Sequence, residues 1–246
     1  MKMFFGMGRL PIGITIHLLL FFCGPANSQL SLGCEGGITR DYLRIDVGPA
    51  NQTMLRPGTG WTAGMPLRWS FRNRWALLAV PQFAQKNYGF YRTGQFSGSY
   101  QSYRNEYIQL PLMGTRRVDI GRIGISVEAG MYIGRWCGAR LNGKLPDVFS
   151  ATDRDLPDGQ IQENFELRSY EESYHFNGKD RRWEYGYVAG IGCSEPLWKG
   201  EIALTIRYYH ALSDMQRSFG LYSPNKGNRV LVLTGAYSIS LKRRKA

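Results

Sequence analysis

The feature that most constrains this chain is a two-residue period of hydrophobic side chains that recurs along most of its length. Over 231–241, apolar residues alternate with small or polar ones, and the segments 61–71, 123–133 and 201–208 follow the same pattern. Such alternation is typical of a β-strand whose two faces lie in different surroundings. The chain therefore reads as a series of two-faced strands.

Four further segments fit this pattern more loosely, which brings the number of expected strands to eight. Each is close to or above the length of about 9–11 residues that a tilted strand needs to cross a bilayer. No stretch after residue 28 has the roughly 18 consecutive apolar residues of a membrane-spanning helix. The four looser segments are 30–38, 75–88, 103–116 and 183–195.

The links between these segments are alternately short and long, and this rhythm predicts the architecture. Short periplasmic turns and long extracellular loops, with both termini in the periplasm, are typical of outer-membrane barrels. We therefore predict an all-β fold, a closed eight-stranded antiparallel transmembrane β-barrel. The short links are 72–74, 118–121 and 196–199, and the long ones are 39–58, 89–102, 137–181 and 212–227.

Charged residues of both signs fall on the face opposite to the apolar one. A soluble eight-stranded barrel would instead bury its apolar face, and unpaired charges in a dry cavity would cost several kcal/mol each. Backbone groups in lipid must also all be hydrogen-bonded, which favours a closed barrel. We expect a salt-bridged network that fills the bore, with a proton or ion path as the alternative, built from Glu35, Arg68, Glu128, Glu184, Glu201 and Arg207.

Residues 1–28 have the layout of a secretory signal peptide. Lys2 and Arg9 precede an apolar stretch, and the small residues Ala26 and Ser28, at the −3 and −1 positions, predict cleavage before Gln29. An uncleaved anchor is the alternative. The expected organisation is a signal peptide over 1–28, the barrel over 29–241 and a basic periplasmic tail over 242–246.

The charge of the chain is strongly positive and unevenly distributed. The sequence has 31 basic and 19 acidic residues, and loss of Lys2 and Arg9 would lower its net charge from +12 to +10. An exported chain seldom meets nucleic acid, so we expect anionic outer-membrane lipid and lipopolysaccharide as partners. The 137–180 segment has nine acidic and five basic residues. We therefore expect this loop to be acidic and exposed outside the cell, where it could bind a cation, a basic protein or a glycan.

Three short motifs resemble those of Bacteroidota outer-membrane β-barrel domain proteins, often called PorT-like. The glycine-rich segment 32–37 resembles the first strand of that family. Segments 80–83 and 107–112 resemble two further strands, with Gln82 and Gln109 where the family has glutamate. The resemblance implies an outer-membrane barrel, and a few family members act in protein secretion. It also marks as structural motif residues Pro81, Gln82, Tyr107, Gln109 and Pro111.

Candidate catalytic and metal-binding groups are few. His210 is followed by Ser213, a pairing that some outer-membrane acyl hydrolases place on the barrel wall, but sequence proximity does not set the hydrogen bond that a nucleophile needs. The ordinary reading is an interfacial histidine beside tyrosines. Three cysteines follow residue 28 without a CxxC motif, so we expect small wall residues, no metal site and no cofactor. They are Cys34, Cys137 and Cys193.

Tryptophans near the expected strand ends are typical of the aromatic girdles of membrane barrels. Trp136 and Trp183 border the longest loop, so stacking on a carbohydrate is a second reading for them. Within that loop, a strand pair is expected between 165–170 and 174–176. The expected strands on either side of the loop, 123–133 and 183–195, would then extend above the membrane as a hairpin.

Together these patterns predict a non-enzymatic integral outer-membrane barrel, inserted by the barrel-assembly machinery, that serves surface binding, envelope integrity or protein secretion. A lipid-modifying enzyme and a small pore are the alternatives.

Overall fold

A computed structural model describes residues 29–45, 52–71, 74–155, 161–178, 180–215 and 226–241. The predicted signal peptide and basic tail lie outside these residues. Among the residues described, no helix combines the length and the apolar character needed to cross a membrane.

The described chain consists almost entirely of strands, many of them longer than the sequence pattern indicated. A short 3-10 helix, η2 (Gly94–Phe96), lies between β5 and β6. The strands are β1 (Gln29–Arg44), β2 (Thr53–Gly64), β3 (Leu67–Phe71), β4 (Trp75–Ala79), β5 (Gln82–Arg92), β6 (Tyr100–Ile120), β7 (Ile123–Asp155), β8 (Ile161–Ser173), β9 (Trp183–Leu197), β10 (Gly200–Ala211) and β11 (Gly227–Ser240).

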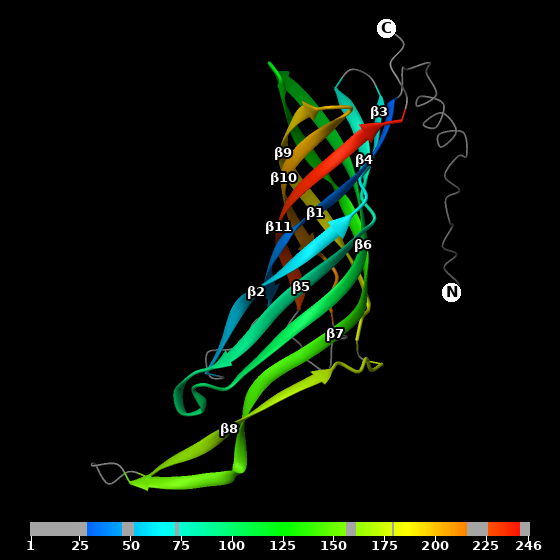
Figure 1. The fold of residues 1–246 in the computed structure, drawn as a ribbon. Helices are drawn as coiled ribbons and strands as arrows, with labels where there is room; N and C mark the ends of the chain where they lie inside the picture. The colour runs from blue at the N-terminus through cyan, green and yellow to red at the C-terminus, as the bar shows by residue number, and fades with distance from the viewer. Residues whose placement is uncertain are drawn as a thin grey trace, which may run out of the picture.

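Ten of these strands close into one antiparallel ring. Strands β2 and β3 together form one side of the wall, and β4 and β5 form the next, so the ring has eight positions. It proceeds through β6, β7, β9 and β10 to β11, which pairs with β1 from Ser31↔Ser240 to Arg44↔Gly227 and closes the circle (Figure 1). This confirms the predicted closed eight-stranded barrel.

Prolines explain why two of the eight positions are split. Pro66 and Pro81 have no backbone N–H group, so each removes one hydrogen bond from the ladder. Neighbouring donors keep the wall joined across both breaks, since Met65 N donates to Pro81 O at 3.0 Å and Val80 N donates to Pro111 O at 3.1 Å. The ring is therefore continuous, although regular strand geometry is interrupted at each of these prolines.

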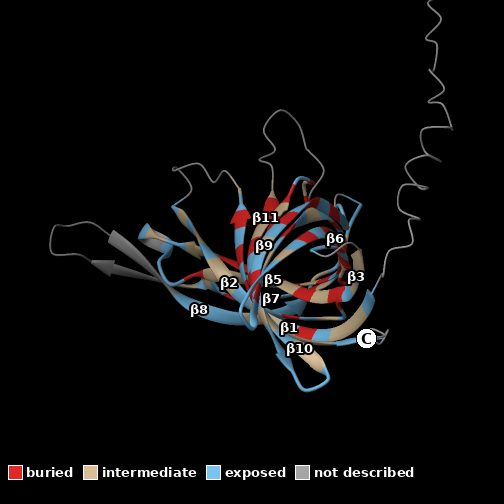
Figure 2. Cartoon of the chain, turned by 90° about the horizontal axis from the view of Figure 1, so that it is seen from above, coloured by how far each residue is buried: buried red, intermediate tan, exposed pale blue. Residues whose placement is uncertain are grey.

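Side-chain burial alternates along the wall as the sequence predicts. On β10, Leu204 and Ile206 face outward and are about half exposed, whereas Thr205 and Arg207 face the bore and are buried. The view down the barrel shows buried residues on the strands of the ring, while β8 lies outside it and its described side chains are mostly exposed (Figure 2). The outward apolar face is the surface that lipid would cover.

Strand pairing continues beyond the ring, as expected for the longest connection, but it involves more strands, and β7 pairs there with β8 and not with an extension of β9. Residues 53–57 of β2, 88–92 of β5, 100–106 of β6 and 138–155 of β7 run on together, and β8 adds to the far side of β7. We call these segments the outer sheet. It leaves the barrel obliquely at the end opposite the short turns (Figure 1).

The predicted 137–181 loop is thus largely a β-hairpin. Lys144 pairs with Ser169, and pairing resumes after an irregularity up to Asp155 and Ile161. The expected pairing of 165–170 with 174–176 is wrong, because 166–173 pair with β7 instead. Residues 174–176 are not in a strand.

Candidate functional site

The bore holds paired charges at three levels, beginning near the short turns. There, Arg117 on β6 donates from Nη1 to both carboxylate oxygens of Glu201 on β10, at 2.7 and 2.6 Å. Its Nε contacts Asp119 at 2.5 Å. The sequence pointed to Arg68 as a partner for the acids, but within the described residues Arg68 forms no ion pair and its buried Nε has no hydrogen-bond partner. Arg117 takes that role.

At the second level, Arg207 joins two carboxylates from opposite directions along the wall. Its Nη1 lies 2.8 and 2.9 Å from the two oxygens of Glu35 on β1. Its Nε donates to Glu128 on β7 at 2.8 Å. All three residues are buried. The structure therefore brings together three of the six residues expected in the network.

At the third level, nearest the outer end, Glu184 on β9 is fully bonded. It pairs with Lys86 on β5, accepts from Tyr132 Oη at 2.9 Å and accepts from Asn228 Nδ2 at 2.6 Å. Lys86 also lies over the Tyr107 ring, 4.6 Å from its centre. Each of these three contacts to the carboxylate comes from a different strand, which fixes the spacing of the wall.

Two buried charged residues of this level were missed by sequence reasoning. Lys86 is 1% exposed and Asp41 is not exposed at all. Both could have been found from the two-residue period of a strand. Lys86 lies an even number of residues from Gln82, and Asp41 lies an even number from Glu35, so each pair shares the inward face. In a two-faced strand, residues two apart share a face.

Apolar side chains occupy much of the bore beside these charged residues. One buried cluster joins residues from β4, β6, β7, β9, β10 and β11 together with Val80. An eight-stranded barrel has an interior that side chains just fill, and these side chains contribute to this between the charged levels. The cluster consists of Leu78, Val80, Met113, Tyr132, Val188, Tyr209, Val230 and Val232.

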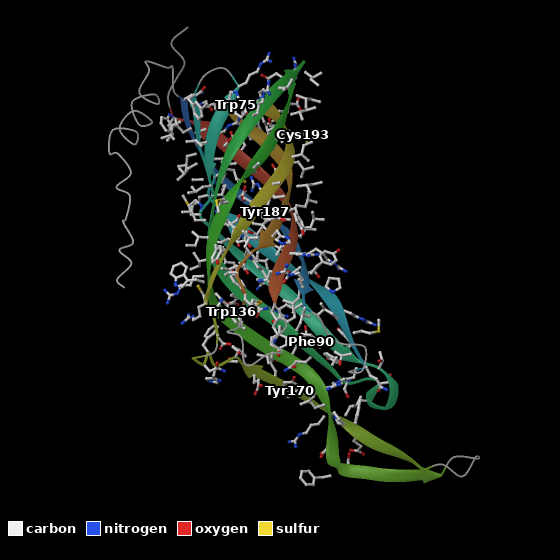
Figure 3. All side chains as sticks on the ribbon, turned by 180° about the vertical axis from the view of Figure 1, so that it is seen from behind. Trp75, Phe90, Trp136, Tyr170, Tyr187 and Cys193 are labelled. Carbon is white, nitrogen blue, oxygen red and sulfur yellow. The ribbon has the colours of Figure 1, made fainter. Side chains whose placement is uncertain are left out.

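An aromatic cluster centred on Trp136, which we call the aromatic cap, lies at the outer end of the bore. The Trp136 ring stacks with Tyr107 and Tyr174 and meets Phe176 edge-on, with ring centres 6.2, 5.4 and 4.9 Å away. Trp136 N donates to Arg182 O at 2.7 Å, and Arg182 Nε donates to Trp136 O at 3.1 Å. Figure 3 labels Trp136 in the outer half of the barrel. Because Trp136 is 4% exposed, it offers no free face to a sugar ring.

A carboxylate braces the loop that carries this cap. Asp180 accepts from Tyr174 Oη at 3.0 Å and from the backbone N of Asn177 at 2.8 Å. Burial of the phenol, followed by its hydrogen bond to Asp180 and the negative charge of that residue, raises the pKa of Tyr174 to about 12. The neutral phenol is therefore the form that holds the loop at neutral pH.

The residues of the family-like motifs support the wall and the bore. Gln82 and Gln109 are register partners on β5 and β6, both buried, and Gln82 Nε2 donates to Tyr209 Oη at 3.1 Å. Tyr107 is buried beneath the cap, Pro111 faces the bore, and Pro81 faces outward. None of these side chains is open to a ligand at the surface except Pro81.

The Ser–His pair does not form a catalytic arrangement in the described structure. The His210 ring stacks on Tyr187, with centres 4.8 Å apart, and its Nδ1 lies 3.4 Å from Tyr208 Oη. Ser213 Oγ instead accepts the backbone N–H of Tyr185 at 3.1 Å. A nucleophile needs its base within hydrogen-bond reach, and these two side chains are turned to different partners.

Trp183, at the other border of the longest loop, is exposed. The guanidinium of Arg135 lies over its ring, 5.8 Å from the centre of the Trp183 ring.

The three cysteines among the described residues do not form disulfides. Cys34, Cys137 and Cys193 are free and exposed. Across the described part of the chain, no three His, Cys, Asp or Glu side chains are grouped so that they could hold a metal ion.

Comparison with known proteins places this geometry in context. Residues 25–217 match the family described as outer membrane protein beta-barrel domain. Among solved structures, Ail of Yersinia pestis is 15% identical with a TM-score of 0.39, covering 86% of this chain and 99% of its own. Neisserial surface protein A is 9% identical (TM-score 0.45, 85% and 96% covered), and OprG from Pseudomonas aeruginosa is 10% identical (0.44, 85% and 95%). No curated protein sequence matches.

Proposed function

Since the chain belongs to the outer membrane protein beta-barrel domain family, we propose that it is a non-enzymatic surface-binding protein of the outer membrane. The observation that carries this proposal is the contrast between the two ends of the strands. The bore holds the paired charges and the aromatic cap, whereas the described side chains of β8 are mostly exposed, and within the described residues β8 pairs on one side only, with β7. An exposed strand edge can pair with an extended segment of another protein.

The charge of β8 favours a basic partner over a second copy of the same strand. Its described side chains include Glu166, Glu171 and Glu172 against Arg168, all of them exposed. Two such edges brought together would place acids beside acids, which is unfavourable. A basic protein segment would hydrogen-bond to the backbone edge of β8 and pair with its acidic side chains.

Three finer features belong to the same proposal. Residues 1–28 act as a cleaved signal peptide, and the barrel-assembly machinery inserts the mature chain. The PorT-like motifs make a Bacteroidota origin the favoured one. Among the roles open to such a barrel, surface binding is favoured over envelope integrity and secretion because the outer sheet has an open edge.

The two alternative functions are disfavoured. The placement of His210 and Ser213 argues against a lipid-modifying enzyme, and the side chains that occupy the bore argue against a pore.

The test is a variant that loses the hairpin beyond Arg140 and Ser173. Replacing residues 141–172 by Asn-Gly joins these two register partners through a two-residue turn and removes Glu166, Glu171 and Glu172. Cells carrying no copy, the shortened form or the full chain would be compared for attachment to host or neighbouring cells, detergent sensitivity and secreted protein. Surface binding predicts that the shortened form loses attachment while the other two readouts match the full chain. If the shortened form attaches normally, or if the null strain leaks or fails to secrete, the proposal is contradicted.

A further inference from the structure

Two arginines lie directly opposite each other on the outward face of the wall, just beyond its apolar part. Arg104 on β6 is the register partner of Arg140 on β7, and both side chains are exposed. Four residues nearer the membrane on β6, Ile108 is 59% exposed on the same face. The pair therefore stands at the outer boundary of the surface that lipid covers.

The row that contains this pair has no acid to neutralise it. The neighbour of Arg104 across to β5 is Asn87, and the neighbour of Arg140 across to β8 is Ser173. Within the described residues neither arginine forms an ion pair. Like charges directly opposite on neighbouring strands destabilise the pairing. An anion that lies between them would remove this cost.

The surroundings of the pair are positive overall and carry the aromatic residues typical of a membrane interface. On the same face, Arg56 stacks over Tyr91 at 4.4 Å from the ring centre, and Tyr91 stacks on Tyr100 at 5.5 Å. Tyrosine rings favour the headgroup level, where one end is apolar and the other wet. The exposed Lys144 adds a further cation, and the acids of neighbouring rows are Glu106 and Glu171.

From this geometry we propose that Arg104 and Arg140 bind a phosphate group of an outer-leaflet glycolipid. Side chains directly opposite on antiparallel strands start about 5 Å apart, so two guanidinium groups can reach one phosphate. Each can donate two parallel N–H bonds to phosphate oxygens. The proposal rests on the outer-membrane location, not on the binding partner of β8, so either can fail alone.

The test measures binding of phosphorylated lipid A to the purified full-length barrel in neutral detergent. Loss of one arginine near a charged headgroup lowers affinity about fivefold. The double variant Arg104→Gln/Arg140→Gln should therefore bind about 25-fold more weakly, and lysine at both positions should restore part of this loss. Arg122→Gln, in a short turn at the other end, is the matched control and should bind like the unaltered chain.

Two further arms decide whether the phosphate on the lipid is what is recognised. Lipid A stripped of its phosphates should bind all variants equally, and millimolar inorganic phosphate should compete only weakly. Retention of the folded, heat-modifiable form on gels shows that the double variant still forms the barrel. The proposal is overturned if the double variant matches Arg122→Gln, if dephosphorylated lipid shows the same loss, or if inorganic phosphate displaces the lipid completely.

Discussion

Arg207 and Glu35, from strands on either side of β11, meet in the bore through two hydrogen bonds of 2.8 and 2.9 Å. Because Arg207 also bonds to Glu128 on β7, one guanidinium links three strands, β1, β7 and β10, across a stretch of five neighbouring positions in the wall. Burying such charges is costly, and they stabilise the fold only when every partner is present. This relationship leads to the first prediction.

Replacing Arg207 by Met should destabilise the folded barrel by about 3–5 kcal/mol, because two buried carboxylates lose their cation. The measurement is urea unfolding in detergent micelles, followed by tryptophan fluorescence. Adding Glu35→Gln and Glu128→Gln to the same chain removes the stranded charges and should recover most of the stability. If Arg207→Met unfolds at the same midpoint urea concentration as the unaltered protein, the ion pairs of Arg207 with Glu35 and Glu128 are not formed.

Leu204→Arg should harm folding in lipid far more than Thr205→Ser. Leu204 is 52% exposed on the outer wall, whereas the neighbouring Thr205 is buried in the bore. Arginine facing lipid near mid-strand costs roughly 2–4 kcal/mol. Folding yields in lipid vesicles provide the comparison, and equal yields for the two variants would mean that the faces are assigned the wrong way round.

The protein should not conduct ions in planar bilayers. The bore is occupied by the paired charges of Arg207, Glu184 and Arg117 and by the apolar cluster between them. Opening the cap with Trp136→Ala should leave the current at baseline, since the inner levels stay in place. Steady channels of porin size from the unaltered protein would contradict the filled bore.

The loop that carries the cap should loosen at high pH through ionisation of Tyr174. Its folded pKa, about 12, is above the ordinary value near 10 of a free phenol. A raised pKa means that the contribution is complete below about pH 10 and is lost between about pH 10 and 12. The difference in tyrosinate absorbance between the unaltered protein and Tyr174→Phe should titrate as one group near pH 12. A difference spectrum centred near pH 10 would contradict the hydrogen-bonded, buried phenol.

The wall of the barrel could be predicted from sequence because alternation is a local property of each strand. Leu204 and Thr205 are assigned to opposite faces by their neighbours in sequence alone. The extent and the pairing of the outer sheet could not be predicted in this way, because Asn142-Gly143 and Pro146-Asp147 are turn formers by themselves. They adopt strand geometry only through pairing with β6 and β8, and pairing between distant segments is not visible in one sequence.

The same limit explains which charged partners were found. Arg207, Glu35 and Glu128 lie inside the predicted strands, so the two-residue period assigned their side chains to the inward face. Arg117 lies one residue past the expected end of its strand at 116, and its pairing with Glu201 depends on β6 continuing to Ile120.

The most direct test of the central claim is to label two ends of the barrel on intact cells. In a chain with Cys34, Cys137 and Cys193 changed to Ser, single cysteines are introduced by Ser169→Cys on β8 and Arg122→Cys in a short turn, both exposed positions. We predict that a membrane-impermeant maleimide labels the first on intact cells and the second only after the outer membrane is opened. Labelling of Arg122→Cys on intact cells, with Ser169→Cys protected, would invert the topology and contradict the surface role of the outer sheet.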